Sequence, residues 1–374
     1  MIDFERAFAN TILTERHRAL IADILSAAVD AADPLRCTEK NLAFTGNTLV
    51  VGGNPYPLDP ESRLVLISLG KAAPAMTQGA INRLNYRYSH GVCVVKHRPQ
   101  DDPGWKHIEL IQGNHPVPGA ESIYAGRKIK EAVEGLGPND LVLLLLSGGG
   151  SSLAMLPAEG IGVEDLSILT ATLLRSGANI DEMNSVRKHV DLLKGGGLLR
   201  LASPTRLAAL VLSDVVGNKL DVIASGPAYP DPSSYADALA IVTKAAGYGN
   251  FPDAILAHLR KGAAGGLPET LKPQDGIALN AFHRIIASNV DSCQAAAARA
   301  NQAVCSAEVV TTALTGEASL VGAQIAAAAR TQMDLDRPFV FIWGGETTVT
   351  VAGSGTGGRN LEAALGAVEG MAGL

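Results

Sequence analysis

The chain has 374 residues, 47% of them hydrophobic and 18% charged, so it is too long for one compact core and too apolar to be disordered. Its formal net charge of −6, without any dense run of Lys and Arg, argues against a surface for nucleic acid or anionic membranes. Forty glycines, 19 prolines and few aromatic residues are typical of an α/β enzyme with many short loops.

The cysteines and the N-terminus give weaker indications. Cys37, Cys93, Cys293 and Cys305 lie far apart and form no CxxC motif, so neither a disulfide framework nor a zinc site is indicated. We expect buried thiols in a reducing cytosol. No segment has the apolar length of a membrane span, and the charged N-terminus lacks a signal-peptide core, which predicts a cytoplasmic protein.

The first half of the chain alternates between helical and extended patterns. A helix is expected within residues 4–32, followed by an irregular, glycine- and proline-containing stretch. Strands are predicted at Leu64–Leu69, Gly91–Lys96, Leu141–Leu146 and Leu207–Ser213. The segments between them include helices from Ala72 and over Ala120–Gly135. Such alternation predicts a parallel sheet with right-handed crossovers.

The segment DLVLLLLSGGGSSL is the most informative in the chain. Leu141–Leu146 shows no polar alternation, so both faces of this strand must be covered. The loop that follows can offer open main-chain N–H groups and hydroxyls to a phosphate or carboxylate. Its residues are Ser147, Gly148, Gly149, Gly150, Ser151 and Ser152. Taken alone, the pattern fits equally well a tight strand-to-helix turn without a ligand.

Two charged residues directly follow predicted strands, where ligands bind in open α/β sheets. Lys71 begins a helix and could hold an anionic oxygen, although a surface lysine at a helix start is about as common. Asp214 could hold Mg²⁺ or orient a substrate hydroxyl, and the alternative for this residue is a helix N-cap.

Two further segments carry weaker signals. NSVRKHVDLLKGGG places Arg187, Lys188 and Lys194 near a second glycine triplet, Gly195–Gly197. This predicts either an oxyanion clamp or a solvated cationic helix with a glycine cap. His115, in the turn NHPVPGAES, either touches substrate or serves in packing.

Turn formers concentrate in SGPAYPDPSS, and we place the domain boundary there, with one domain over residues 1–235 and a second over 236–374. In the second half strands are expected at Arg284–Ala287, Glu308–Ala313 and Phe339–Trp343, with a hairpin strand at Thr347–Val351. The expected helices are Tyr235–Ala246, Val290–Ala300, Ala318–Arg330 and Arg359–Val368.

The C-terminal segment GGETTVTVAGSGTGGRN contains a GxGxxG match but leaves no room for the second strand of a dinucleotide-binding unit. A phosphate-facing loop is the better interpretation, with Glu346, Gly357 and Gly358 beside the planar guanidinium of Arg359. GxxxxGK[ST] and GxSxG are both absent from the sequence, which excludes a Walker-type loop and disfavours an α/β-hydrolase.

Together, the blocks SLGKAA, GNHPVPGAES, LLSGGGSSL, NSVRKHVDLLKGG, VLSDVVGNKLDVIASGP, LTGEAS and GGETTVTVAGSGTGGRNLE resemble the class II glycerate 2-kinase family. The resemblance runs from about Leu64 to the C-terminus, with the blocks in the family's order. It implies an α/β protein with a Rossmann-like, parallel-sheet N-terminal domain and a smaller α/β MOFRL-type C-terminal domain. Family members usually continue into an acidic, glycine-rich DGTDG-type segment, and this chain stops at Leu374 before it.

The resemblance also implies an activity: ATP-dependent phosphorylation of D-glycerate to 2-phospho-D-glycerate, with Mg²⁺, in an interdomain cleft. It implies catalytic roles for Lys71 and Arg359, and we assign Asp214 to the acceptor hydroxyl or the metal. The expected partners are small molecules, with no nucleic acid or membrane, and a homodimer remains open. The rival functions are a hydroxypyruvate reductase using NAD(P)H and a non-catalytic binding module for small phosphates or hydroxy acids.

Overall fold

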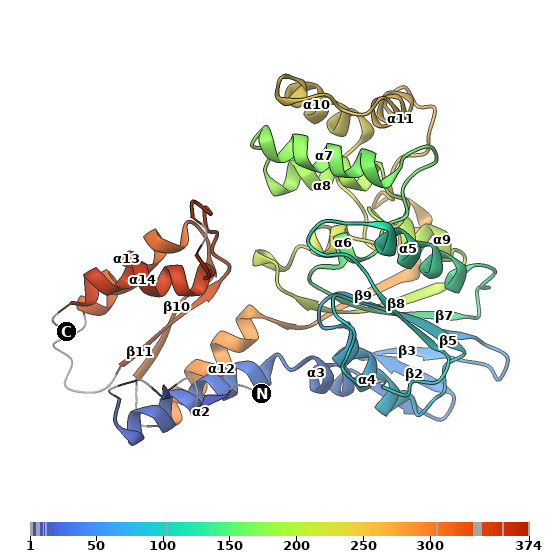
Figure 1. Cartoon of the computed structure of the whole chain (residues 1–374). Coiled ribbons are helices and arrows are strands. Elements are labelled where there is room, and N and C mark those ends of the chain that lie inside the picture. The colour runs from blue at the N-terminus through green and yellow to red at the C-terminus, as the bar shows by residue number, and fades with distance from the viewer. Residues whose placement is uncertain are drawn as a thin grey trace. The chain divides into compact units, whose positions relative to one another are not determined.

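The computed structural model describes residues 3, 4, 8, 9, 11, 13–101, 103–303, 306–331, 339–353 and 355–372. The chain forms two compact units, shown in Figure 1: unit 1 combines residues 1–33 with 287–374, and unit 2 comprises residues 34–286. The boundary predicted after residue 235 therefore lies inside unit 2. The turn formers before Tyr235 mark a loop that leads to a helix of the same unit. Turn-forming residues indicate a loop, but they do not indicate whether the segments on its two sides share one core.

Unit 2 is built on a six-stranded sheet with the strand order β6-β5-β4-β7-β8-β9. Its strands are β4 (Leu64–Leu69), β5 (His90–Val95), β6 (Ile108–Gln112), β7 (Leu141–Ser147), β8 (Arg206–Ser213) and β9 (Ala281–Ser288). The first five pair parallel to their neighbours, as the alternating pattern predicts. Each of these four pairings brings the carboxyl ends of two neighbouring strands to the same edge of the sheet.

Helices and a small sheet cover this central sheet. The helices of unit 2 are α3 (Pro34–Lys40), α4 (Ala73–Leu84), α5 (Ala120–Val133), α6 (Gly150–Leu153), α7 (Val163–Arg175), α8 (Ile180–His189), α9 (Gly197–Ala202), α10 (Tyr235–Ala245) and α11 (Asp253–Ala263). An antiparallel sheet joins β1 (Leu42–Thr45), β2 (Thr48–Val51) and β3 (Asn54–Pro57). This small sheet lies in the stretch that was expected to be irregular, and β6 lies in a segment for which no element was predicted.

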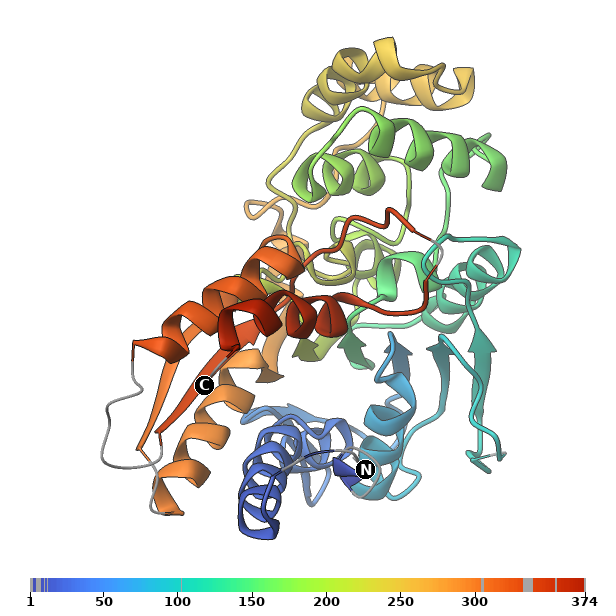
Figure 2. The same ribbon diagram turned by 60° about the vertical axis from the view of Figure 1, so that its left-hand side comes forward.

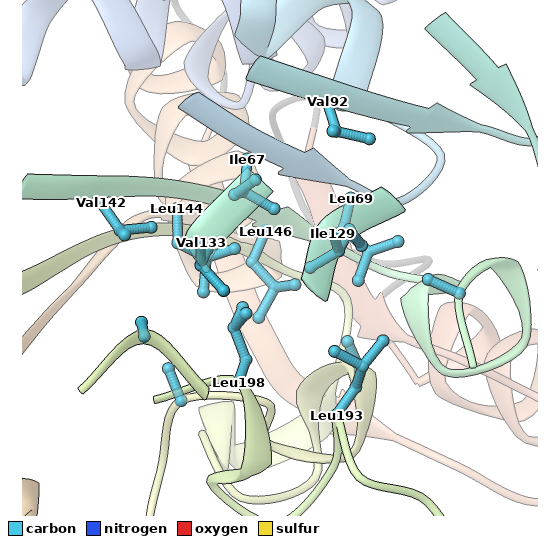
Figure 3. Close-up of a cluster of buried hydrophobic side chains, with 14 of the residues drawn as sticks. Ile67, Leu69, Val92, Ile129, Val133, Val142, Leu144, Leu146, Leu193 and Leu198 are labelled. Atoms are coloured by element: carbon cyan, nitrogen blue, oxygen red, sulfur yellow. The ribbon is translucent and has the colours of Figure 1, made fainter. Parts of the chain in front are cut away.

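The core confirms that the central strands β4 and β7 are buried on both faces. Every residue of β4 and β7 is buried. Figure 3 shows one face, where Ile67, Leu144 and Leu146 gather with Ile129 of α5 and Leu198 of α9. The alternate residues of the same strands pack on the other side, with α4 and the three-stranded sheet. Burying both faces explains why the strands read as unbroken apolar runs.

A separate helical layer belongs to the same unit. The helices α7, α8, α10 and α11 share their own apolar cluster, which includes Leu169, Val186, Val242 and Ile255. In Figures 1 and 2 these four helices lie together, beyond the helices that cover the sheet. Arg187 lies in the last turn of α8.

Unit 1 contains a two-stranded parallel sheet of β10 (Ser306–Leu314) and β11 (Phe339–Gly345). Its helices are α2 (Glu15–Ala31), α12 (Asn289–Gln302), α13 (Ala318–Arg330) and α14 (Arg359–Met371). Ile24 and Ala300 anchor an apolar cluster between α2, α12 and the strands. The helices α13 and α14 approach closely at Gly322 and Gly366, where an added Cβ would overlap backbone of the facing helix.

The predicted hairpin strand at Thr347–Val351 is wrong. This segment instead makes a single parallel bridge between Thr348 and Glu317, and the Glu317 carboxylate accepts a hydrogen bond from the Thr350 N–H at 2.9 Å. The alternating apolar pattern is real, but Val351 is 82% exposed and has no sheet face to cover.

Cysteines, metal ligands and membrane spans were also considered in the sequence. Cys37, Cys93 and Cys293 are free and buried, whereas Cys305 lies outside the described residues. The described part of the chain contains no group of three or more His, Cys, Asp or Glu side chains arranged to hold a metal. Nor does any helix in that part combine the length and apolarity needed to cross a membrane.

Candidate functional site

The loop after β7 is held against the loop after β4. The Lys71 N–H donates to the Gly148 carbonyl at 2.9 Å, and the Ala72 N–H donates to Ser147 Oγ at 3.0 Å. Ser147 is buried, so its hydroxyl fixes the loop and does not face a ligand. These two bonds place Lys71 beside the glycine triplet, as predicted from their positions after neighbouring strands.

Each glycine of the triplet has a different neighbour. A Cβ on Gly148 would overlap the Asp214 carboxylate, and a Cβ on Gly150 would contact Ala224 at 2.7 Å. At Gly149 a Cβ would lie 3.2 Å from Lys71 Cε and 3.3 Å from the His115 ring. Gly149 also has φ +86°, which disfavours any other residue. The absence of side chains therefore lets three strand-end loops converge on Gly148–Gly150.

The serine hydroxyls that follow are used within the protein. Ser151 Oγ shares a 2.8 Å hydrogen bond with Ser225 Oγ, which in turn donates to Asn184 Oδ1 at 3.3 Å. Ser152 Oγ donates to the Gly149 carbonyl at 3.3 Å. This chain of hydroxyls joins the β7 loop to α8 and to the loop after β8. The loop's capacity to bind an anion then rests on its main-chain N–H groups rather than on Ser147, Ser151 and Ser152.

Asp214 follows β8 and is exposed beside Gly148. One carboxylate at this place fits Mg²⁺, which in nucleotide enzymes is held by one or two carboxylates together with the substrate's phosphates. The next carboxylate along the loop, Asp221, forms an ion pair with Lys188 at 3.5 Å. Because its carboxylate lies against Gly148, Asp214 is the candidate metal ligand on this loop.

Arg187 and Lys194, which the sequence analysis grouped together, differ in the structure. Lys194 is buried and forms an ion pair with Asp191, so its charge is neutralised within the protein and we remove it from the candidate site. Arg187 is partly exposed, lies one turn after Asn184 on α8, and forms no ion pair with another described residue. Burial lowers the pKa of Arg187, and an anionic ligand would offset that cost.

The second glycine triplet serves packing. Gly195 and Gly196 have φ of +54° and +79°, and their N–H groups donate to the carbonyls of Ser225 and Gly226 at 3.0 and 2.8 Å. A Cβ on Gly196 would overlap Leu271. The predicted second oxyanion clamp is therefore a structural turn that supports the Ser225 loop.

Arg359, Glu346, Gly357 and Gly358 belong to unit 1. Arg359 is the first residue of α14, and its guanidinium binds Glu346 Oε1 at 2.5 Å and the Thr347 carbonyl at 3.2 Å. Both side chains of the ion pair are 47% exposed. Gly357 and Gly358 are open, since a Cβ added to either would meet no described atom within 4 Å. Ser354 of the same loop lies outside the described residues.

A cavity of about 490 Å³ lies elsewhere, lined by His90, His107, Glu109, Lys128 and Glu131 among others. His90 is the first residue of β5, and His107 directly precedes β6, so this cavity is at the amino ends of the strands. Ligands of open parallel sheets bind at the opposite, carboxyl ends. The candidate site is therefore at the strand ends around Gly148–Gly150.

Parallel strands with a glycine-rich loop, a lysine and a carboxylate at their carboxyl ends are typical of α/β enzymes, in which this edge of the sheet binds the ligand. Two family models match the chain: a domain of unknown function (DUF4147) over residues 20–260 and the MOFRL family over residues 339–374. The chain is 37% identical to a glycerate 2-kinase of Pyrococcus horikoshii, over 92% of this chain and 77% of that protein.

Further relatives carry two kinds of name. A D-glycerate 2-kinase of Thermotoga maritima is 36% identical, over 96% of this chain and 81% of that protein. A crystal structure of glycerate kinase from Thermotoga maritima superposes with a TM-score of 0.80 at 36% identity, covering 96% of this chain and 81% of that one. A protein of Agrobacterium vitis named as a putative hydroxypyruvate reductase is 37% identical, over 96% of this chain and 78% of its own length. The chain belongs to the glycerate 2-kinase family.

Proposed function

We propose that this protein transfers the γ-phosphoryl group of ATP to the 2-hydroxyl of D-glycerate, producing 2-phospho-D-glycerate and ADP. The observation that carries the proposal is the convergence of Lys71, the Gly148–Gly150 nest and Asp214 at the ends of β4, β7 and β8. Membership of the glycerate 2-kinase family supports glycerate as the acceptor.

Phosphoryl transfer asks a protein mainly to align two oxygens and to neutralise charge on the transferred group. The Lys71 ammonium would bind a phosphate oxygen, since its side chain lies against Gly149. The main-chain N–H groups of the nest would bind the remaining phosphate oxygens. Arg359 of unit 1 is proposed to neutralise charge on the same phosphoryl group through its planar guanidinium.

Asp214 has one of two tasks in this proposal. It would hold Mg²⁺, which when bound neutralises phosphate charge, or it would accept the proton of the attacking hydroxyl. The structure fits the first task because the carboxylate is exposed beside Gly148, where the phosphates would lie.

The test is an assay of the purified protein with D-glycerate, ATP and Mg²⁺ that follows ADP release. We expect ADP in an amount equal to the phosphoglycerate formed, and no oxidation of NADH when hydroxypyruvate is supplied. The names of the Agrobacterium vitis relatives make the reductase a second candidate. Oxidation of NADH by hydroxypyruvate without ADP release from glycerate would select that candidate instead.

A further inference from the structure

The ends of β5 and β6 carry polar side chains that the proposed function does not yet use. The strand order β6-β5-β4-β7-β8 fixes the order of the residues that follow each strand. In that order they are His115, Lys96 with His97, Lys71, Gly148–Gly150, and Asp214. Lys71 is in the middle, with the nest and the carboxylate on one side and a group of bases on the other.

Short connections place His115 and Lys96 at this edge. The Gly70 N–H donates to the Val94 carbonyl at 3.3 Å, so the β4 and β5 loops start together. The Gly113 N–H likewise donates to the Val95 carbonyl at 2.9 Å, two residues before His115. The His115 ring then reaches Gly149. A Cβ added to this glycine would lie 3.3 Å from His115 Cδ2 and 3.2 Å from Lys71 Cε.

The basic residues at this edge are Lys71, Lys96, His97 and His115, and none of them forms an ion pair with a described carboxylate. Lys71 and the His115 ring lie against the same glycine, Gly149, and Lys96 directly follows β5 at the same edge of the sheet. Burial lowers the pKa of His115 most, and the charges of Lys71, Lys96 and His97 lower it further. Within the described ranges, neither Lys71 nor Lys96 forms an ion pair. His115 Nδ1 is shielded from solvent and has no hydrogen-bond partner there. Unpaired cations around an unsatisfied ring nitrogen are the surroundings that an anionic oxygen stabilises.

We propose that Lys96 and His115 bind the carboxylate of the hydroxy-acid substrate, on the β5–β6 side of Lys71. This inference rests on the proposed function, which brings two anions to the site. If the nest and Asp214 take the nucleotide's phosphates, the acceptor must approach from the opposite side of the transferred group, because attacking and leaving oxygens are in line. Lys96, at the end of β5, lies on that side, and the His115 ring lies beside Lys71 at Gly149. A short 2-hydroxy acid has one carboxylate to offer these two side chains.

Substitutions of Lys96 and His115 are expected to affect the two substrates differently. In Lys96→Met and His115→Gln, we expect KM for D-glycerate to rise roughly 10- to 100-fold, as for loss of a hydrogen bond to a charged group. KM for ATP is expected to stay within about twofold in Lys96→Met, since Lys96 follows β5, on the side of Lys71 away from the nest. Lys96→Arg keeps the charge and is expected to recover part of the loss. Lys130→Met, an exposed lysine on α5, is the matched control and should behave as wild type.

A direct measurement of D-glycerate binding tests the site without depending on turnover. Calorimetric titration of D-glycerate into the full chain should show binding to the wild type and the control, with a parallel loss in Lys96→Met and His115→Gln. Circular dichroism and Tm confirm that each variant is folded. Unchanged glycerate binding in both folded variants overturns the proposal, as does a rise in KM for ATP alone, which would assign the bases to phosphate.

The outcomes also separate this proposal from the proposed function. A wild-type protein that binds D-glycerate through Lys96 and His115 but releases no ADP would keep the carboxylate site and refute the kinase. A wild-type protein that makes phosphoglycerate, with variants of unchanged KM, would keep the kinase and refute the site. No binding of D-glycerate to the wild type would refute both.

Discussion

Lys71 is the residue on which the site is centred. Its N–H is bound to the Gly148 carbonyl and its side chain lies against Gly149, so both its backbone and its ammonium are directed to the β7 loop. The side chain is exposed and supports no core contact. Its removal is therefore expected to change chemistry and leave folding intact.

In Lys71→Ala we expect kcat to fall by about 10²- to 10³-fold, the usual effect of losing one group that stabilises charge in the transition state. The measurement is steady-state ADP release, with Tm as the check on folding and Lys130→Ala as the control. A folded Lys71→Ala variant with near-normal turnover would show that the lysine serves only the turn.

Gly148 offers a second test at the scale of one atom. A Cβ there would overlap the Asp214 carboxylate, whereas a Cβ on Gly276 would meet nothing within 4 Å. We expect Gly148→Ala to lower kcat/KM at least about tenfold by displacing Asp214, and to raise the Mg²⁺ concentration needed for half-maximal rate. Gly276→Ala should leave both quantities unchanged. Equal behaviour of the two variants would refute the placement of Asp214 against the nest.

At the scale of elements, the central sheet is tied together by Asp140, directly before β7. Its carboxylate accepts hydrogen bonds from the N–H groups of Arg63 and Gly137 at 2.7 and 2.8 Å, and from Arg63 Nη2 at 2.6 Å. Burial alone would raise the pKa of Asp140, but these bonds outweigh it and hold the pKa below its usual value. The ionised form is thus favoured in the folded protein, and it links the starts of β4 and β7.

Asp140→Asn is expected to lower the free energy of unfolding by about 1–3 kcal/mol at neutral pH. Because the folded-state pKa is lowered, the stabilisation is complete above the unfolded pKa of about 3.9 and is lost as pH falls through the lower folded value. Denaturant titrations near neutrality and near about pH 3 measure this, with the exposed Asp101→Asn as control. A deficit that stays the same in acid would contradict the assignment.

The elements also show what the sequence could predict. Leu64–Leu69 and Leu141–Leu146 were found because strands buried on both faces are continuous apolar runs. The small sheet around Thr48–Val51 was missed, since its strands are only four residues long, glycines separate them, and β3 contains two prolines. At Thr347–Val351 the alternation predicted a strand, but a period of two does not ensure a partner.

Only part of the candidate site could be predicted from the sequence. Lys71, Gly148–Gly150 and Asp214 follow strands, and parallel pairing brings strand ends together. Lys194 could not be excluded from sequence because its partner Asp191 neutralises it only through a buried contact. The contribution of Ser225 and Asn184 was missed, since two uncharged side chains in different segments give no pattern.

At the scale of the whole molecule, Lys71 and the nest belong to unit 2, whereas Arg359, for which the family resemblance implies a catalytic role, belongs to unit 1. The Arg359–Glu346 pair is about half exposed, so it contributes little to stability, about 0–1 kcal/mol. We therefore expect Arg359→Ala to fold normally but to lose about 10³-fold in kcat, as when a transition-state arginine is removed.

The control for Arg359 lies in the same unit. Arg299 forms a comparable surface ion pair with Asp23, and Arg299→Ala should retain wild-type turnover and a similar Tm. If both arginine variants turn over normally, Arg359 has no part in phosphoryl transfer, and the reaction is confined to the groups of unit 2.

The position of the new phosphate ester tests the central claim most directly. Proton-coupled ³¹P NMR of the mixture of protein, D-glycerate, ATP and Mg²⁺ distinguishes a phosphate on the C2 oxygen from one on the C3 oxygen. We expect ADP and an ester whose phosphorus is coupled to the single proton on C2. An ester coupled to the two protons on C3, or the absence of any phosphoglycerate, would contradict it.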